Sequence, residues 1–298
     1  MAPILLFIYN RPDHLVRLLQ SLTTNAEARQ SDLIVYADGT RTEADEPAVR
    51  LSRDICRRHA DHFRSFTLIE RPENWGLARN IIDGVSTQIA RYGRVIVLED
   101  DLVVAPHFLR FMNDALDVYA DEPRVGHIQA CNFCNEKKLP PTFLIRWTGS
   151  WGWATWERAW RLFNPDGRAL LSELEARGLT RQFDFDGVYG YTLMLRRQVE
   201  GLNNSWAIRW NASLFLADVL SLNVGRSLVQ NTGFDGSGTH CNNDSPYSST
   251  LYTDVLPVVR IDPIEENLKA RRTLARFYAF TNSKPAKAWR LLRRLLHF

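Results

Sequence analysis

The chain has 298 residues, of which 45% are hydrophobic and 24% are charged, and its formal net charge at pH 7 is +3. These proportions are typical of a packed soluble protein. The charge is too small to indicate nucleic-acid binding, and four cysteines are too few for a disulfide-stabilised scaffold of this size.

Strands and helices are predicted to alternate through the first third of the chain. Residues 3–9 form a short apolar run that ends at polar residues and Pro12, as expected for a buried strand followed by the first turn of a helix. The predicted strands are residues 3–9, 32–37, 65–69 and 94–98, and the predicted helices begin at Pro12, span 48–62 and 77–92, and begin again at Pro106. This alternation indicates an α/β fold with a mostly parallel central sheet flanked by helices.

The second half of the chain is less regular. Residues 146–160 contain five tryptophans, residues 164–202 are predicted to be helical, and residues 205–222 are predicted to form an aromatic-rich helix. The end of the chain, residues 268–298, contains nine Lys or Arg and no Asp or Glu. The basic charge is therefore local, and the sequence predicts a basic helical tail. No apolar stretch reaches the length of a transmembrane helix.

Three consecutive carboxylates, Glu99, Asp100 and Asp101, close the fourth predicted strand. Ligands of parallel α/β sheets bind beyond the carboxyl ends of the strands, and adjacent carboxylates repel one another unless a cation or hydrogen-bond donors neutralise them. Mg²⁺ and Mn²⁺ prefer oxygen ligands and are often held by one or two carboxylates together with substrate phosphates. The cluster therefore predicts a metal site, and the alternative is an exposed acidic turn.

Four short motifs follow one another in the order expected of a known fold. They are FIYNRP at residues 7–12, DG at 38–39, NWGLARN at 74–80 and LEDDL at 98–102. Together they resemble the GT-A fold of glycosyltransferases, in particular bacterial family-2-like sugar transferases and the β-1,2-N-acetylglucosaminyltransferase I family, and SWGW at 150–153 is similar to a further element of the latter. The resemblance covers roughly residues 3–240.

The resemblance implies roles for the acidic cluster and its neighbours. Asp101 would bind the metal that bridges the donor diphosphate, Asp100 would contact the ribose, and Glu99 would contact the donor sugar. Asp38 would read the base, expected to be uracil.

Other residues of the same motifs would line the nucleotide site. Tyr9 ends the first predicted strand and Asn10 and Arg11 follow it. Arg11 would approach the nucleotide or its phosphates, since a guanidinium is a good phosphate partner. Arg79 would do the same, and its alternative is an ordinary arginine on a helix surface. The resemblance implies a division of the GT-A domain, residues 1–254, into a nucleotide-binding half (1–104) and an acceptor half (105–254), followed by a basic helical appendage (255–298).

The loop at residues 233–241 contains three glycines, and its backbone N–H groups could approach an anion. Ser237 could bond the diphosphate, and His240 could complete the metal coordination. We expect the loop to act as a lid over the donor, with a plain surface loop as the alternative.

The tryptophans and the catalytic base are the least determined parts of the site. Trp151 and Trp153 are predicted to form a platform for a sugar ring, whereas Trp156 and Trp160 are predicted to be core. An inverting transferase needs a carboxylate that accepts the acceptor's hydroxyl proton. The Trp-Asp-Asp-Trp motif that holds the base in the related family has no acidic counterpart here, so Asp186 and Asp184 are the candidates.

The sequence thus predicts a metal-dependent glycosyltransferase, inverting in mechanism, that moves a sugar from a nucleotide donor such as a UDP-sugar to a glycan or lipid-linked saccharide. The cofactor would be Mn²⁺ or Mg²⁺, and no nucleic-acid partner is expected. The alternatives are a nucleotidyltransferase and a non-catalytic sugar-binding protein on the same fold. We expect a cytoplasmic location. Residues 284–298, a leucine-striped basic segment, could lie at the inner face of an anionic membrane.

Overall fold

The computed structural model describes residues 1–134, 139–234, 247–283 and 285. Over these residues the chain forms one eight-stranded sheet and one two-stranded ribbon. The strands are β1 (Ile4–Ile8), β2 (Asp32–Ala37), β3 (Ser65–Glu70), β4 (Arg94–Glu99), β5 (Leu102–Val104), β6 (Val125–Gln129), β7 (Thr142–Ile145), β8 (Trp153–Trp156), β9 (Leu220–Val224) and β10 (Val229–Asn231).

The main sheet has the order β3-β2-β1-β4-β8-β6-β9-β7. The strands β3, β2, β1 and β4 are parallel neighbours, β8 runs antiparallel to both β4 and β6, β9 is parallel to β6, and β7 closes the sheet antiparallel to β9. The ribbon pairs β5 with β10 in antiparallel fashion. The first four predicted strands are confirmed, and the sheet is mostly parallel because six of its eight strands share one direction.

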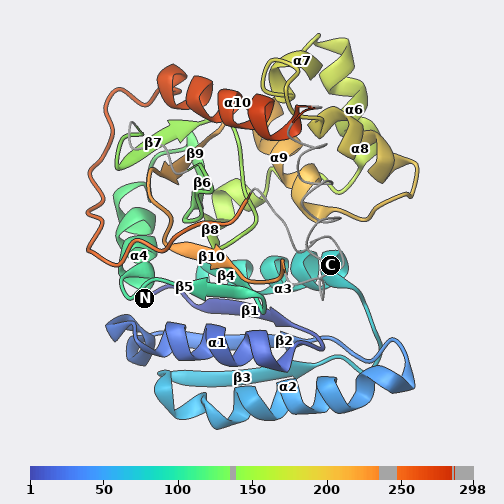
Figure 1. Ribbon diagram of the computed structural model, residues 1–298, viewed down its shortest axis with the longest axis vertical. Coiled ribbons are helices and arrows are strands. Elements are labelled where there is room, and N and C mark those ends of the chain that lie inside the picture. The colour runs from blue at the N-terminus through green and yellow to red at the C-terminus, as the bar shows by residue number, and fades with distance from the viewer. Residues whose placement is uncertain (135–138, 235–246, 284, 286–298) are drawn as a thin grey trace.

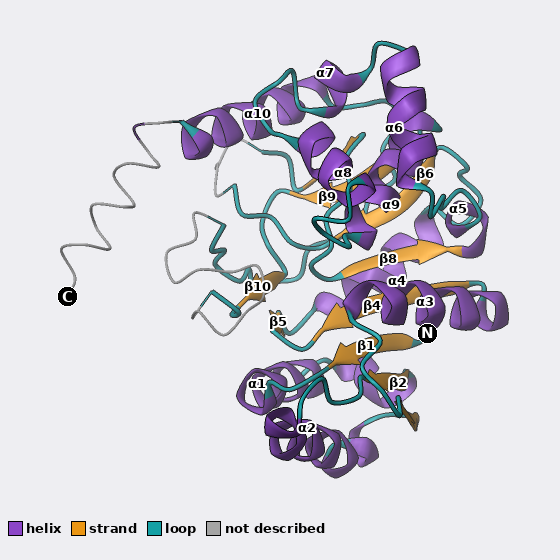
Figure 2. Ribbon diagram, turned by 90° about the vertical axis from the view of Figure 1, so that its right-hand side faces the viewer, coloured by secondary structure: helices purple, strands orange, loops and turns teal. Residues whose placement is uncertain are grey.

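The helices lie on both faces of the sheet (Figures 1 and 2). They are α1 (Pro12–Thr23), α2 (Glu46–Arg58), α3 (Leu77–Tyr92), α4 (Phe108–Val118), α5 (Glu157–Trp160), α6 (Gly167–Ala176), α7 (Thr180–Phe183), α8 (Tyr191–Val199), α9 (Trp206–Leu216) and α10 (Leu268–Asn282). Short 3₁₀ turns, Ala26–Gln30, Glu43–Asp45 and Ala60–His62, lie in the connections.

Alternation along each strand divides the core into two layers. In β1, Ile4, Leu6 and Ile8 join the apolar cluster beneath α1, α2 and α4, whereas Leu5 and Phe7 join the cluster beneath α3, α5 and α9. A parallel strand buried on both faces needs this continuous apolar sequence, which is why the strand could be recognised from composition alone.

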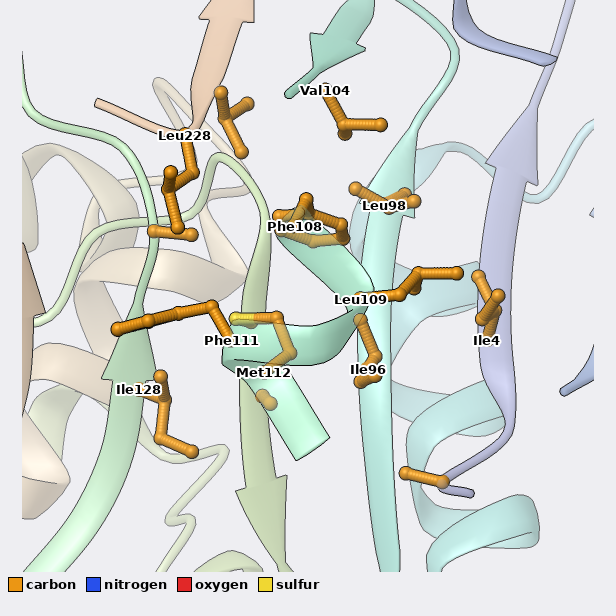
Figure 3. Packing of buried hydrophobic residues seen from close by; sticks show 14 of the residues in the cluster. Ile4, Ile96, Leu98, Val104, Phe108, Leu109, Phe111, Met112, Ile128 and Leu228 are labelled. Atoms are coloured by element: carbon orange, nitrogen blue, oxygen red, sulfur yellow. The ribbon is translucent and has the colours of Figure 1, made fainter. Parts of the chain in front are cut away.

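The helix α4 lies across the centre of the first layer (Figure 3). Leu109 of α4 lies close to Ile4 of β1 and Ile96 of β4, while Phe111 and Met112 point toward Ile128 of β6. All six of these side chains are at most 1% exposed. The helix thereby joins the parallel half of the sheet to the mixed half.

A third apolar cluster joins the helices of the second half to α10. Ala270, Leu274 and Tyr278 of α10 are buried among residues of α6, α8, α9 and β7. The C-terminal segment is therefore packed into the fold as far as Asn282, and residues 284 and 286–298 lie outside the described residues.

One prediction about the second half was wrong in detail. The helix expected at residues 205–222 ends at Leu216, and β9 begins at Leu220, because Asp218 adopts a left-handed backbone (φ 56°) that turns the chain into the sheet. Residues 164–202 are helical as predicted and form three helices, with left-handed turns at Gly178 and Gly187 between them. In the part of the chain that the structure describes, no helix is both long and apolar enough to cross a membrane.

Candidate active site

The polar residues after β1, β2 and β4 lie at one edge of the sheet. The strand β1 pairs with β2 on one side and β4 on the other, all parallel, so their carboxyl ends coincide. This places Tyr9, Asn10 and Arg11 between Asp38 and the acidic cluster Glu99–Asp101. The expectation that these segments meet is confirmed by the strand order.

The side chain of Asp100 turns back toward the first strand. Its Oδ2 atom accepts a hydrogen bond of 2.9 Å from the backbone N–H of Tyr9, and the residue is only 8% exposed. This bond fixes the end of β4 against the end of β1.

Asp101 faces Arg11 and the strand β10. Its Oδ2 atom accepts a bond of 3.0 Å from Nη1 of Arg11, and its backbone carbonyl accepts bonds from the N–H and the hydroxyl of Thr232 at 2.8 and 2.9 Å. Its second oxygen, Oδ1, is buried without a hydrogen-bond partner among the described residues. A buried carboxylate oxygen in this state is costly and is suited to a cation.

The hydroxyl of Thr232 connects Asp101 to the first helix. Because this hydroxyl donates its hydrogen to Asp101, it accepts from Nδ1 of His14, 2.8 Å away. His14 is 4% exposed and lies in the first turn of α1. Sequence reasoning missed both residues, although the position of His14 just beyond a parallel strand could have drawn attention to it.

The three carboxyls are held in an unfavourable electrostatic setting. Burial, followed by the charges of Asp101 and Asp100, raises the pKa of Glu99 well above its usual range. Burial and the charge of Asp101 raise the pKa of Asp100 to about 7. Burial also raises the pKa of Asp101, although Arg11 and His14 oppose that shift. One arginine does not neutralise two buried carboxyls and a half-buried third, so the cluster favours an additional cation.

The carboxylate of Asp38 holds the loop that leads into α3. Oδ1 accepts from the N–H groups of Gly39 and Trp75 at 3.0 and 2.8 Å, and Oδ2 accepts from Gly76 at 2.9 Å. Asp38 therefore shapes the loop, while Oδ2, which accepts one bond, retains a lone pair that could face a ligand.

Two arginines enclose the indole of Trp75. The guanidinium carbons of Arg71 and Arg79 lie 3.7 and 3.8 Å from its ring centroid, which is too close for both to share one face. Arg71 is also bound to Asn80 and Asp83. Arg71 directly follows β3 and was not singled out from the sequence, although the strand-end rule that selected Asp38 applies to it equally.

Tyr9 and Asn10 hold the loop that follows Asp38. The hydroxyl of Tyr9 accepts from the backbone N–H of Arg41 at 3.0 Å, and the amide of Asn10 donates to Asp45 at 2.9 Å. Both side chains are half-buried, which leaves part of each accessible to a ligand.

The family comparison agrees with this geometry. Residues 4–150 match the family model described as glycosyl transferase family 2. The chain has the GT-A fold and resembles family 2 glycosyltransferases. The match supports a glycosyltransferase, and the fold contains the strands, the acidic cluster and the α3 motif on which the resemblance was based. No curated protein matches the chain in sequence.

Solved structures with a similar fold are distant. TarS of S. aureus is 15% identical, with 47% of this chain and 23% of that chain covered and a TM-score of 0.33. The mannosyltransferase PcManGT from Pyrobaculum calidifontis, in complex with GDP-Man and Mn²⁺, is 14% identical, with 97% and 83% covered and a TM-score of 0.39. Mouse xyloside xylosyltransferase 1 is 14% identical, with 62% and 75% covered and a TM-score of 0.34. Likenesses this distant indicate no shared substrate.

The tryptophan prediction was correct for two residues and wrong for one. Trp156 and Trp160 are core residues, 5% and 7% exposed. Trp153 is also core, at 0% exposed, because the alternation of β8 points its ring under α9, where it stacks on His127 and Trp206. It therefore cannot form a sugar platform. Trp151 is half-buried and meets Phe234 edge to face at 5.6 Å.

The structure does not bring Asp184 and Asp186 to the acidic cluster. Both follow α7, which lies at the top of Figure 1, far from β1 and β2. Asp184 accepts from the N–H of Thr192, and Asp186 forms an ion pair of 2.6 Å with Arg271 of α10 that lowers its pKa. These contacts explain both residues as structural, and they give no support to the prediction of a base here.

The remaining site predictions fall outside the described residues. Ser237 and His240 lie in the segment 235–246, which the structure does not describe, and so does most of the predicted lid. Within the described part of the chain, no group of three or more His, Cys, Asp or Glu side chains is arranged to hold a metal ion.

Proposed function

We propose that this protein transfers a sugar from a nucleotide-diphosphate donor, a UDP-sugar, to a glycan or lipid-linked saccharide with inversion of configuration, and that Mn²⁺ or Mg²⁺ is its cofactor. The observation that carries the proposal is the carboxyl cluster Glu99–Asp101 at the end of β4, of which Asp100 and Asp101 are buried, with Arg11 beside it. Such a site can bind a cation and, through that cation and Arg11, a diphosphate.

The residues fit a metal of this kind. The unpaired, buried Oδ1 atom of Asp101 is an oxygen ligand without a partner among the described residues. Mg²⁺ sites commonly use one or two carboxylates and complete their coordination with water and substrate phosphates, so a full cage of protein ligands is not required. When bound, the metal would stabilise the charge that develops on the diphosphate leaving group.

The chain's own residues would then hold the donor. Asp100, fixed by the N–H of Tyr9, would face the ribose, and Glu99 would face the donor sugar. Asp38 would accept from the base through the remaining lone pair of Oδ2. Asp184 and Asp186 are not part of this assignment, because their contacts place them beside α8 and α10.

The metal dependence of nucleotide binding tests the proposal. UDP should raise the thermal stability clearly in the presence of Mn²⁺ and only weakly in EDTA, since ligand at about 100 times its dissociation constant adds about 2.7 kcal/mol. Asp101→Ala should abolish the metal-dependent part. Asp114→Ala, a surface aspartate of α4, is the matched control and should retain it. Equal metal-dependent increases in thermal stability in the two variants would show that Asp101 does not bind the metal.

Turnover assays separate the remaining function classes. A glycosyltransferase should release UDP slowly from a UDP-sugar by hydrolysis and should do so faster with a suitable acceptor. Formation of a nucleotide sugar from a sugar phosphate and UTP would instead identify a nucleotidyltransferase. Metal-dependent UDP binding without turnover of any donor would favour the non-catalytic alternative.

A further inference from the structure

A cleft lies between α3 and α9, on the face of the sheet opposite to α1, α2 and α4. Its volume is about 530 Å³, within the range of small-molecule sites. The polar and aromatic residues of its wall include Trp75, Arg79, Asp83, Ser86, Asn204 and Arg209. Apart from Arg79, sequence reasoning gave none of these residues a role.

Arg209 is the unusual member of this wall. It is only 7% exposed, yet its guanidinium bonds solely to neutral oxygens of the described residues: the carbonyls of Ser205 and Pro165 and the side chain of Asn204, at 3.1, 3.2 and 3.3 Å. No carboxylate in the described ranges lies within ion-pair distance of it. A buried arginine stays protonated, and a buried charge is costly unless an opposite charge accompanies it.

The neighbouring charges leave the cleft positive. Arg79 is exposed and has only a distant partner, Glu73, at 3.9 Å. Asp83 is the one acid that the described wall contains, and it is already paired with Arg71. Two guanidinium groups from different helices thus face one cleft without a close carboxylate of their own, which is a suitable arrangement for an oxyanion.

The rest of the wall can bind hydroxyl groups. Trp160 donates its indole N–H to the hydroxyl of Ser86 at 2.9 Å, which leaves the Ser86 hydrogen available to a ligand. Asn204 is exposed at the N-terminal end of α9. Polar groups of this kind surrounding a cationic centre match a sugar that carries a charged group.

We propose that the α3–α9 cleft is a binding subsite for an anionic saccharide, a sugar bearing a carboxylate or a phosphate, with Arg209 and Arg79 as the anion-binding residues. The cleft starts at Trp75, whose backbone Asp38 fixes, so it adjoins the edge of the sheet where the donor is proposed to bind. The identification of the bound saccharide as the acceptor rests on the proposed function. Anion binding in the cleft is independent of that function.

Calorimetric titration of the full chain in EDTA tests the subsite, because EDTA removes the metal on which ligand binding at the donor site is proposed to depend. The probes are glucuronic acid, glucose 6-phosphate, glucose and inorganic phosphate. We expect the two charged sugars to bind, glucose to bind at least about tenfold more weakly, and phosphate to bind more weakly than glucose 6-phosphate. Equal affinities for glucose and the charged sugars would overturn the proposal. Phosphate binding as tight as that of glucose 6-phosphate would reduce the site to a free-anion site and would also overturn it.

Substitutions in the wall of the cleft test whether the charged sugars bind there. Arg79→Gln should weaken binding of the charged sugars about tenfold, the loss typical of one charge-assisted hydrogen bond. Arg91→Gln, an exposed arginine at the other end of α3, is the matched control and should have no effect. Arg209→Gln should weaken binding further. If the Arg209→Gln variant does not fold, the comparison of Arg79→Gln with Arg91→Gln still tests whether the charged sugars bind in the cleft. Indistinguishable affinities in those two variants would overturn the proposal.

A donor-site variant distinguishes this proposal from the proposed function. Asp101→Ala should lose metal-dependent UDP binding and keep the affinity for charged sugars unchanged. If the wild-type protein binds charged sugars but transfers no sugar to them, the proposed function fails and the subsite stands. If it transfers sugar but shows no charge preference in binding, the subsite fails and the function stands.

Discussion

Gly233 lies against the carboxylate of Asp101, just beyond β10. A Cβ atom at this position would lie 2.5 Å from Oδ2 of Asp101, the same oxygen that accepts from Arg11. Only glycine leaves the carboxylate where the structure has it. The glycine-rich segment, expected from the sequence to be a lid, therefore begins with a residue that shapes the proposed metal site.

Gly233→Ala should displace the carboxylate of Asp101 and weaken metal-dependent UDP binding at least about tenfold, which corresponds to about 1.4 kcal/mol. The measurement is calorimetric titration with UDP and Mn²⁺. Gly190→Ala is the matched control, because a Cβ there would meet only Leu193 at an ordinary 3.7 Å. Equal affinities in both variants would mean that Asp101 tolerates the displacement or does not bind the metal.

His127 is a buried neutral residue of the second core layer. Trp210 donates its indole N–H to Nδ1 of His127 at 3.1 Å, so Nδ1 carries no hydrogen and Nε2 faces Gln129 as a donor. Burial lowers the pKa of His127 from its usual 6.5 to about 3. A histidine with a lowered folded-state pKa contributes stability that is present above pH 6.5 and is lost as the pH falls toward 3.

His127→Gln should therefore reduce the dependence of the free energy of unfolding on pH in the acidic range. Between pH 6.5 and 3 the wild-type free energy of unfolding should fall more steeply than that of the variant, by up to about 1.4 kcal/mol per pH unit. Urea unfolding at a series of pH values measures both slopes. Parallel curves over that window would show that His127 does not titrate on unfolding as its burial implies.

At the scale of elements, Asp38 joins the end of β2 to the start of α3. Its carboxylate bonds three backbone N–H groups, those of Gly39, Trp75 and Gly76, and it is 6% exposed. A residue that only read the nucleotide base would not need this arrangement. The conformation of the loop before α3, and with it the position of Trp75, depends on this one side chain.

Asp38→Ala should lower the free energy of unfolding by about 1–3 kcal/mol, because buried N–H groups lose their acceptor. Hydrogen exchange at Trp75 and Gly76 should become faster in the same variant. Asp54→Ala, a half-exposed aspartate of α2, is the control and should change neither quantity. Unchanged stability together with weaker UDP binding would assign Asp38 to base recognition alone.

At the scale of the whole molecule, the chain ends in two segments with different expected roles. The helix α10 contributes Ala270, Leu274 and Tyr278 to the third core cluster, and the N–H of Asn267, just before it, donates to the carbonyl of Leu144 on β7 at 2.7 Å. Residues 284–298 carry five Lys or Arg, no acid, and a leucine stripe. The sequence of this last segment favours an anionic lipid surface as its partner.

Deletion of residues 284–298 should weaken binding to vesicles that contain anionic lipid and leave thermal stability and turnover of a soluble acceptor unchanged. Sedimentation with phosphatidylserine vesicles, compared with neutral ones, measures the first effect. Deletion from residue 268 onward is the contrasting variant and should abolish cooperative unfolding, since it removes the buried side chains of α10. Equal vesicle binding by the full chain and the shorter deletion would contradict a membrane role for the tail.

The sequence by itself determined the parallel half of the sheet and the acidic cluster at its edge. Strands such as β1 and β4 are short continuous apolar runs, and the polar residues that end them must meet because neighbouring parallel strands share a carboxyl edge. The tertiary structure alone decided which side chains share a site. Trp151 and Trp153 are two residues apart, yet packing beneath α9 buries Trp153 completely, and Asp186 is held by Arg271 from the far end of the chain. Likewise, Thr232 and Gly233 reach Asp101 only because β10 pairs with β5, a contact between segments more than a hundred residues apart that no local pattern encodes. His14 is connected to Asp101 through the hydroxyl of Thr232.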